Sequence, residues 1–213
     1  MKNKQLLLFS DYDKLSNQIH RNYLNVPGLI YYESFLAPSE QIICLETLDC
    51  HTWLGDLKRR VQHYGYRYDY KARRVDPSMY VGPLPPFAAK IAEKLVLTGL
   101  VSKKPDQLII NEYRPGQGIA PHVDCEPCFQ DEIATISLGS VYEMELSEIS
   151  TGITKKVDLE LGSCLVFTGC SRYAWKHGIR PRLTDRGRKR ARRVSLTFRK
   201  VILDERNRKE VDG

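Results

Sequence analysis

Two potential metal ligands stand two positions apart near the end of the segment 108–126, LIINEYRPGQGIAPHVDCE. In an extended chain, His122 and Asp124 point to the same face, because side chains at i and i+2 share a side. A third potential ligand, His177, lies far along the chain, beyond several predicted strands that can return it to the first two. Two histidines and one carboxylate form the facial triad of non-haem Fe(II) sites. This pattern predicts an iron site, against the alternative that these are ordinary structural side chains.

The segment Arg193–Arg199, RVSLTFR, predicts a strand with one polar and one apolar face. Its two arginines fall on the polar face, which suits a pocket wall better than a solvent edge. Arginine pairs bidentately with carboxylates. Since Arg193 and Arg199 are too far apart along a strand to hold one end of a short diacid, we expect them to serve its two ends.

Length, composition and charge limit the class of protein to which this chain can belong. The chain has 213 residues, 42% hydrophobic and 28% charged, as expected for one soluble domain. Its net charge of +7 favours a polyanionic partner, nucleic acid first, over an undistinguished basic surface. No apolar run is long enough for a membrane span, and the N-terminus does not resemble a signal peptide. We therefore expect a cytoplasmic monomer.

Six cysteines, at positions 44, 50, 125, 128, 164 and 170, show no disulfide framework, so reduced thiols are expected. Cys125 and Cys128 form a CxxC, a spacing found in zinc and redox sites. Because the chain lacks a second CxxC or a CxxH, a structural zinc site is not expected.

Residues 1–25 are predicted to form a loosely held polar arm, 26–203 the folded domain and 204–213 a tail. Two helices are predicted in the first half. One runs from Pro38 to about Leu48, with an apolar stripe of Ile42, Leu45 and Leu48. The other carries Phe87, Ile91 and Leu95 on its apolar face. Beyond Lys104 the pattern alternates with period two, which indicates an α+β, mostly β chain with a sandwich or small barrel.

Tyrosine recurs at positions 64, 66, 68 and 70, with Arg67 and further arginines around it. Period two predicts a strand or an extended loop with one aromatic face. A half-buried edge strand and a surface that stacks bases between phosphate-binding arginines both explain this pattern. The stretch from Arg180 to Arg192 is also rich in arginine, and it suits either a phosphate-contacting or a solvated loop.

Three motifs together resemble the AlkB family of Fe(II)- and 2-oxoglutarate-dependent dioxygenases. They are NxY followed after eight residues by HxD, a later KHG, and RxSLTFR. The resemblance covers about residues 26–201 and is tightest in PGQGIAPHVD and SLTFRKV. It is nearest to bacterial AlkB-like alkylation-repair proteins. The AlkB domain of the tRNA wobble-uridine hydroxylases is similar too.

The resemblance implies a double-stranded β-helix (jelly roll) with supporting N-terminal helices and a nucleotide-recognition lid at about residues 53–85. It implies that His122, Asp124 and His177 bind Fe(II), with 2-oxoglutarate and dioxygen as co-substrates. Arg193 and Tyr113 would bind the distal carboxylate of 2-oxoglutarate. Asn111 and Arg199 would hold the end near the metal. Ser195 stands where some family members have Asn.

For the substrate, the resemblance favours oxidative demethylation of N-alkylated bases in RNA or single-stranded DNA, as in alkylation-damage repair. The main reason is Glu126, since an acid at this position can accept a hydrogen bond from an exocyclic amine. Aromatic residues of the lid would stack the flipped base, and the candidates are Tyr64, Tyr66, Tyr68, Tyr70 and Tyr80, with Arg67 nearby. Hydroxylation of a modified tRNA wobble uridine is the alternative enzyme activity. A non-catalytic jelly-roll module that binds nucleic acid is the alternative of another class.

Overall fold

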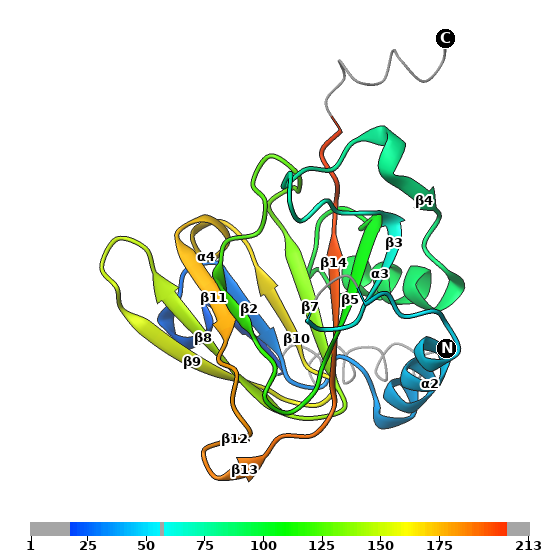
Figure 1. The fold of residues 1–213 in the computed structure, drawn as a ribbon. Coiled ribbons are helices and arrows are strands. Elements are labelled where there is room, and N and C mark those ends of the chain that lie inside the picture. Colours follow the sequence, from blue (N-terminus) through cyan, green and yellow to red (C-terminus); the bar gives the residue numbers. More distant parts are fainter. Residues whose placement is uncertain (1–17, 56–57, 204–213) are drawn as a thin grey trace, which may run out of the picture.

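The computed structural model describes residues 18–55 and 58–203, which form two facing β-sheets with helices outside the larger one (Figure 1). The larger sheet has the strand order β1-β2-β10-β7-β14-β5-β3-β4, and the smaller has β6-β11-β8-β9. The strands of the larger sheet are β1 Ile19–Arg21, β2 Leu29–Tyr32, β3 Val61–Tyr66, β4 Tyr80–Gly82, β5 Gln107–Tyr113, β7 Ile133–Leu138, β10 Cys164–Phe167 and β14 Arg193–Arg199. Those of the smaller sheet are β6 Ile119–His122, β8 Tyr142–Glu148, β9 Thr154–Leu159 and β11 Trp175–Ile179.

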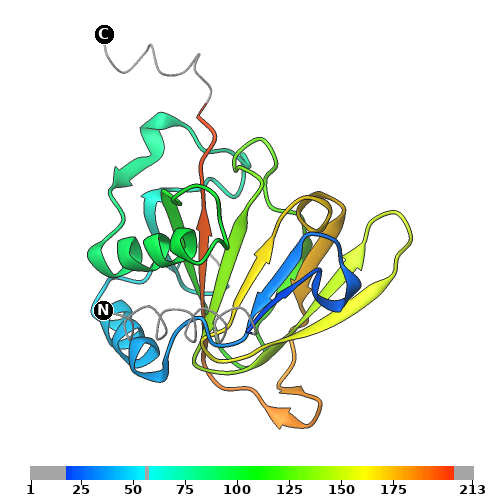
Figure 2. The same ribbon diagram turned by 180° about the vertical axis from the view of Figure 1, so that it is seen from behind.

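Short helical elements complete the description: η1 Tyr23–Asn25, α2 Pro38–Asp49, η2 Pro77–Met79, α3 Pro86–Leu97 and α4 Cys170–Tyr173. Helices α2 and α3 cover the outer face of the larger sheet, as the view from behind shows (Figure 2). The expected mostly β jelly roll with supporting helices is confirmed. Among the described residues, no helix has the length and apolar character needed to cross a membrane.

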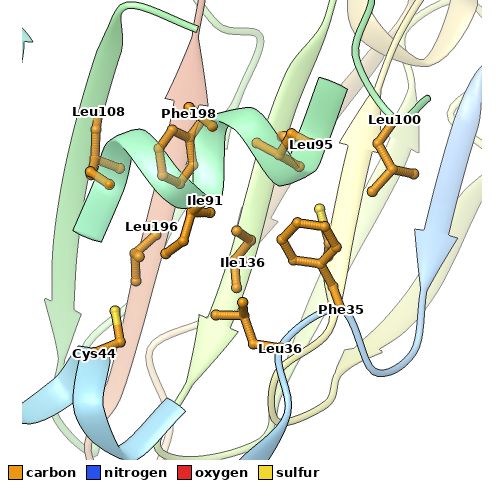
Figure 3. Packing of buried hydrophobic residues seen from close by; sticks show 14 of the residues in the cluster. Phe35, Leu36, Cys44, Ile91, Leu95, Leu100, Leu108, Ile136, Leu196 and Phe198 are labelled. Atoms are coloured by element: carbon orange, nitrogen blue, oxygen red, sulfur yellow. The ribbon is translucent and has the colours of Figure 1, made fainter. Parts of the chain in front are cut away.

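Strand β14 is the middle of the larger sheet and separates two hydrophobic cores. It pairs antiparallel with β5 and β7, and all seven of its residues are buried. Its apolar side chains pack beneath the helices, where Leu196 and Phe198 meet Ile91 and Leu95 of α3 (Figure 3). The second core lies between the two sheets and includes Leu146, Leu159 and Trp175. The polar face of β14 therefore turns toward the interior of the sandwich.

Helix α2 begins as predicted but buries a different face. Glu40 Oε2 accepts a hydrogen bond from the Ala37 backbone N–H at 2.8 Å and caps the first turn. Leu48 and Cys44 are buried, whereas Ile42 is 58% exposed, so the predicted stripe is wrong at Ile42. The sheet meets the helix on the side of Cys44, a small thiol that hydropathy patterns mark only weakly.

The folded domain begins earlier in the chain than predicted. Residues 1–17 lie outside the described part of the chain, as does the tail 204–213. Ile19–Arg21 form β1, which pairs with Ile30–Tyr32 of β2 at the edge of the larger sheet. Because these residues bond to the sheet, they belong to the domain and not to a loosely held arm.

The arginine-rich stretch forms a hairpin of β12 Thr184–Asp185 and β13 Arg188–Lys189, at the lower edge of Figure 1. Arg190 donates two hydrogen bonds to Asp185, at 2.6 and 2.9 Å. Arg182 and Arg186 bind Glu143 of β8 at 2.7 and 2.9 Å. Arg182, Arg186 and Arg190 are paired with buried carboxylates and anchor the hairpin to the smaller sheet, whereas Arg180, Arg188 and Lys189 are exposed, so the stretch is in part a solvated loop.

Arg190→Met should therefore destabilise the protein by about 3–5 kcal/mol, because it leaves the buried Asp185 carboxylate without its main counterion. Arg188→Met is the matched control. The Arg188 side chain is 52% exposed in its pair with Asp158, so its loss should cost less than about 1 kcal/mol. Denaturant unfolding measures both, and equal effects would show that the hairpin is not held by the Arg190 pair.

Candidate active site

The two histidines of the expected triad face each other on adjacent strands. β11 pairs antiparallel with β6, which sets His177 opposite His122, and the two ring centroids are 4.4 Å apart. The His122 Nδ1–H donates to the Ala120 carbonyl at 2.9 Å, leaving Nε2 as a free lone-pair donor. Phe167 stacks on His177 at 4.6 Å between centroids. The fold thus brings together two imidazoles from distant parts of the sequence.

Asp124 follows β6 and completes the cluster. Its Oδ2 lies 3.9 Å from His177 Nε2, and its Oδ1 accepts a 2.8 Å hydrogen bond from Arg199. Burial, the largest single effect, would raise the pKa of this carboxyl, but Arg199, the two histidines and Arg172 together outweigh it and hold the pKa well below its usual range. Burial, reinforced by His122, lowers the pKa of His177 to about 3. The cluster is therefore a carboxylate beside a neutral imidazole at ordinary pH.

This donor set, two imidazoles and one carboxylate, has the chemistry that Fe(II) takes. Within residues 18–55 and 58–203, no three His, Cys, Asp or Glu groups are already gathered at metal-binding spacing. The triad lacks this spacing because Asp124 directs one oxygen to Arg199 and only the other toward His177. The residues fit the metal in kind and in neighbourhood.

A narrow cavity continues from the triad into the sandwich, and its polar wall comes from β5 and β14. Asn111, Tyr113, Arg193 and Ser195 line it, as the sequence predicted. Thr197 lines it too and was missed as a site residue, although it shares the polar face of β14 with Arg193. Arg199, in contrast, does not line this cavity and lies beside Asp124 and the Phe129 ring.

Arg193 is the unusual member of this wall. It is 1% exposed, and burial lowers its pKa to about 10. Its Nη2 donates to Ser137 Oγ at 2.8 Å and its guanidinium lies over the Tyr113 ring, but its Nε has no hydrogen-bond partner. A buried cation with an unsatisfied donor is costly. The arrangement suits an anionic ligand such as a carboxylate, which is the group that 2-oxoglutarate would present here.

Arg59 reaches the same region from the loop before β3. Its Nε donates to Asn111 Oδ1 at 2.7 Å, and its guanidinium is 5.8 Å from the Tyr113 ring centroid. Its only signal in the sequence is its place in an arginine-rich stretch, which does not distinguish it from its neighbours. The structure makes Arg59 the link between the inner cavity and the surface outside it.

An outer cavity of about 530 Å³ adjoins the triad. Its wall includes Tyr68, Tyr70, Arg73 and Lys176, together with His122 and Asp124. Tyr64 packs against Phe87 of α3, and Tyr66 packs against Tyr80. None of these three tyrosines lines the outer cavity, and neither does Arg67. The alternation of tyrosines follows a strand only as far as Tyr66, where β3 ends. Tyr64 packs against the hydrophobic core beneath helices α2 and α3.

The turn after Asp124 differs from expectation in two ways. Glu126 is exposed and lines neither the inner nor the outer cavity. Cys125 and Cys128 form a disulfide, so the prediction of reduced cysteines is wrong for this pair. Arg172, which is 2% exposed, fixes the segment by donating to the carbonyls of Asp124 at 3.0 Å and Cys125 at 3.3 Å.

Comparison with known proteins agrees with this geometry. The family model of the 2OG-Fe(II) oxygenase superfamily matches residues 38–199. The tRNA (carboxymethyluridine(34)-5-O)-methyltransferase alkbh8 of Xenopus tropicalis is 39% identical, over 82% of this chain and 32% of that protein. The Alkylated DNA repair protein ALKBH8 homolog of Arabidopsis thaliana is 37% identical, over 84% of this chain and 59% of that protein. This chain therefore spans between a third and three-fifths of these relatives.

The alpha-ketoglutarate-dependent dioxygenase AlkB of Salmonella typhimurium is 32% identical, over 70% of this chain and 68% of that protein. Among solved structures, OsALKBH1 superposes with a TM-score of 0.64 at 20% identity, over 82% of this chain and 97% of that one, which shows the shared fold. The chain belongs to the AlkB family of the 2OG-Fe(II) oxygenase superfamily, dioxygenases that use Fe(II), 2-oxoglutarate and dioxygen.

Proposed function

We propose that this dioxygenase hydroxylates a carbon of a modified uridine in tRNA, at the wobble position. We prefer this activity to demethylation because Glu126 is exposed and lies outside both cavities. An acid that selects an exocyclic amine would have to reach the base, so the main argument for demethylation is lost. Relatives at 37–39% identity support the proposal, since some of them are named for a tRNA uridine at position 34.

In this proposal, His122, Asp124 and His177 hold the iron. Arg193 and Tyr113 bind the distal carboxylate of 2-oxoglutarate, while Asn111 and Ser195 serve its other end. Arg199 lies outside the inner cavity and acts through Asp124, to which it donates a hydrogen bond. When bound, iron and 2-oxoglutarate convert dioxygen into an oxidant, release succinate and carbon dioxide, and place one oxygen atom into a substrate C–H bond. Arg199 keeps Asp124 ionised, and burial keeps His177 neutral, so both are ready to bind the metal.

The outer cavity is the place for the base. Its volume of about 530 Å³ lies within the usual range for ligand pockets. Tyr68 and Tyr70 offer ring surfaces on which a base can stack, and Arg73 and Lys176 offer positive charge to the flanking phosphates. A base that enters here meets His122 and Asp124 at the inner end, where oxidation would occur.

Oxidative demethylation is the second candidate, because AlkB of Salmonella typhimurium is 32% identical over 70% of this chain. Both reactions begin with hydroxylation of a carbon. On an N-methyl group the product loses formaldehyde, whereas a hydroxylated carbon side chain of uridine is stable. The two candidates therefore differ in what is released.

The deciding experiment offers two substrates to the Fe(II)-loaded enzyme. One is tRNA with carboxymethyluridine or its methyl ester at position 34, and the other is an oligonucleotide with 1-methyladenine or 3-methylcytosine. We expect tRNA nucleosides heavier by one oxygen atom, equimolar succinate and no formaldehyde. The His122→Ala variant, which lacks a proposed metal ligand, should give none of these. Formaldehyde from the methylated bases with unchanged tRNA would establish demethylation instead.

The Glu126→Gln variant tests whether the Glu126 carboxylate contacts the base. Because Glu126 is exposed and lines neither cavity, kcat/KM should change by less than about threefold, which is less than 1 kcal/mol. Lys176→Gln is the control, since Lys176 lines the outer cavity and its loss should raise KM for RNA. A loss of about tenfold or more in Glu126→Gln would place this carboxylate on the base after all.

Arg193→Met tests the proposed carboxylate site through stability. Arg193 is buried without an acidic partner, so replacing it should leave the free energy of unfolding unchanged or raise it by about 1–2 kcal/mol. Addition of 2-oxoglutarate should raise the melting temperature of the wild type and not that of the variant. Strong destabilisation of the variant without ligand would make Arg193 a structural residue.

A further inference from the structure

We propose that Cys125 and Cys128 form a reversible two-electron redox site, which takes up the oxidising equivalent when the outer cavity holds no substrate. This inference rests on the proposed function, because it needs the iron site at His122, Asp124 and His177. Of the six cysteines, only this pair lies beside that site. Cys125 directly follows Asp124 and lines the outer cavity with it.

The two cysteines, joined by a disulfide in this structure, stand on one hydrogen-bonded turn. Their Cα atoms are 5.3 Å apart, within the range for a disulfide. The Cys128 N–H donates to the Cys125 carbonyl at 3.3 Å, and Arg172 donates to the same carbonyl. Little rearrangement therefore separates the dithiol from the disulfide, as redox chemistry in a CxxC requires.

Arg73 links the redox state of the two cysteines to the wall of the outer cavity, because its backbone contacts both sulfur atoms. Its carbonyl oxygen lies 3.2 Å from Cys125 Sγ and 3.3 Å from Cys128 Sγ. Two thiols can donate S–H hydrogen bonds to this oxygen, whereas a disulfide has no hydrogen to donate. Arg73 has a φ of 51°, in the left-handed region that non-glycine residues rarely adopt. Reduction thus favours the position of Arg73 on the cavity wall, and oxidation weakens it.

The electron balance supports the assignment. Full reduction of dioxygen takes four electrons, of which the oxidative decarboxylation of 2-oxoglutarate supplies two and a substrate C–H bond supplies the rest. Without substrate, two thiols can supply the missing pair: 2-oxoglutarate, dioxygen and two R–SH give succinate, carbon dioxide, R–S–S–R and water. Both S–H bonds break, one S–S bond forms, and the hydrogens leave in the water. A dithiol reductant then restores the thiols by exchange.

The wild-type protein is tested first. It is fully reduced, freed of reductant and given Fe(II), 2-oxoglutarate and air without nucleic acid, and each cysteine is then followed by differential alkylation and peptide mass spectrometry. Cys125 and Cys128 should lose alkylation together, with about one disulfide per succinate in the first turnover. The exposed Cys50 and Cys170 should stay alkylated, and bound substrate RNA should suppress the disulfide. Succinate formed with Cys125 and Cys128 intact would overturn this inference alone, and so would equal oxidation without 2-oxoglutarate.

Cys128→Ser, with Cys170→Ser as control, gives a second readout. In repeated turnover with a dithiol reductant and without nucleic acid, the Cys128 variant should lose most of the succinate formed after the first turnover, whereas the control should match the wild type. In the wild type, reduction should slow amide hydrogen exchange in residues 69–74, which surround Arg73. Unchanged exchange and unchanged succinate would overturn the inference. Absence of succinate from every variant, with or without RNA, would overturn the proposed function as well.

Discussion

The burial of charged guanidinium groups on β14 is the constraint on which the rest of the structure depends. Arg193 is 1% exposed at the start of a seven-residue buried strand. A buried cation needs hydrogen-bond or cation–π partners. Ser137 and the rings of Tyr113 and Tyr142 provide some of them. The flanking strands β5 and β7 and the smaller sheet enclose what remains. The fold therefore keeps a buried, partly unsatisfied cation at a cost to its own stability, which is a sign of function.

The close pairing of β6 and β11 is the second requirement, and two glycines permit it. A Cβ on Gly178 would lie 2.8 Å from the Pro121 nitrogen, and one on Gly118 would lie 2.1 Å from the Ile179 carbonyl oxygen. Any side chain at either position would push the strands apart and separate His122 from His177. Gly118 of PGQGIAPHVD and Gly178 of KHG thus act through packing, by bringing two distant imidazoles next to each other.

Sequence patterns predicted those parts of the molecule that depend on local alternation. The two faces of β14 and the spacing of His122 and Asp124 follow from period two alone. The failures have a common cause, because a pattern shows which residues share a face and not what that face meets. Tyr64 alternates like a base-stacking residue but packs on α3. Cys44 lies on the buried side of α2 in place of Ile42, and Arg59 meets Asn111 only through tertiary folding.

Net charge is also a poor guide until its counterions are known. The chain carries +7, and its densest basic stretch reads as a phosphate-binding loop. Yet Arg182, Arg186 and Arg190 are committed to Glu143 and Asp185, so they fasten a hairpin and leave little field for a polyanion. Arg59, Arg73 and Lys176 line the outer cavity together with His122. In the function proposed above, the positive charge at this wall would attract nucleic acid at the place where the base enters the cavity.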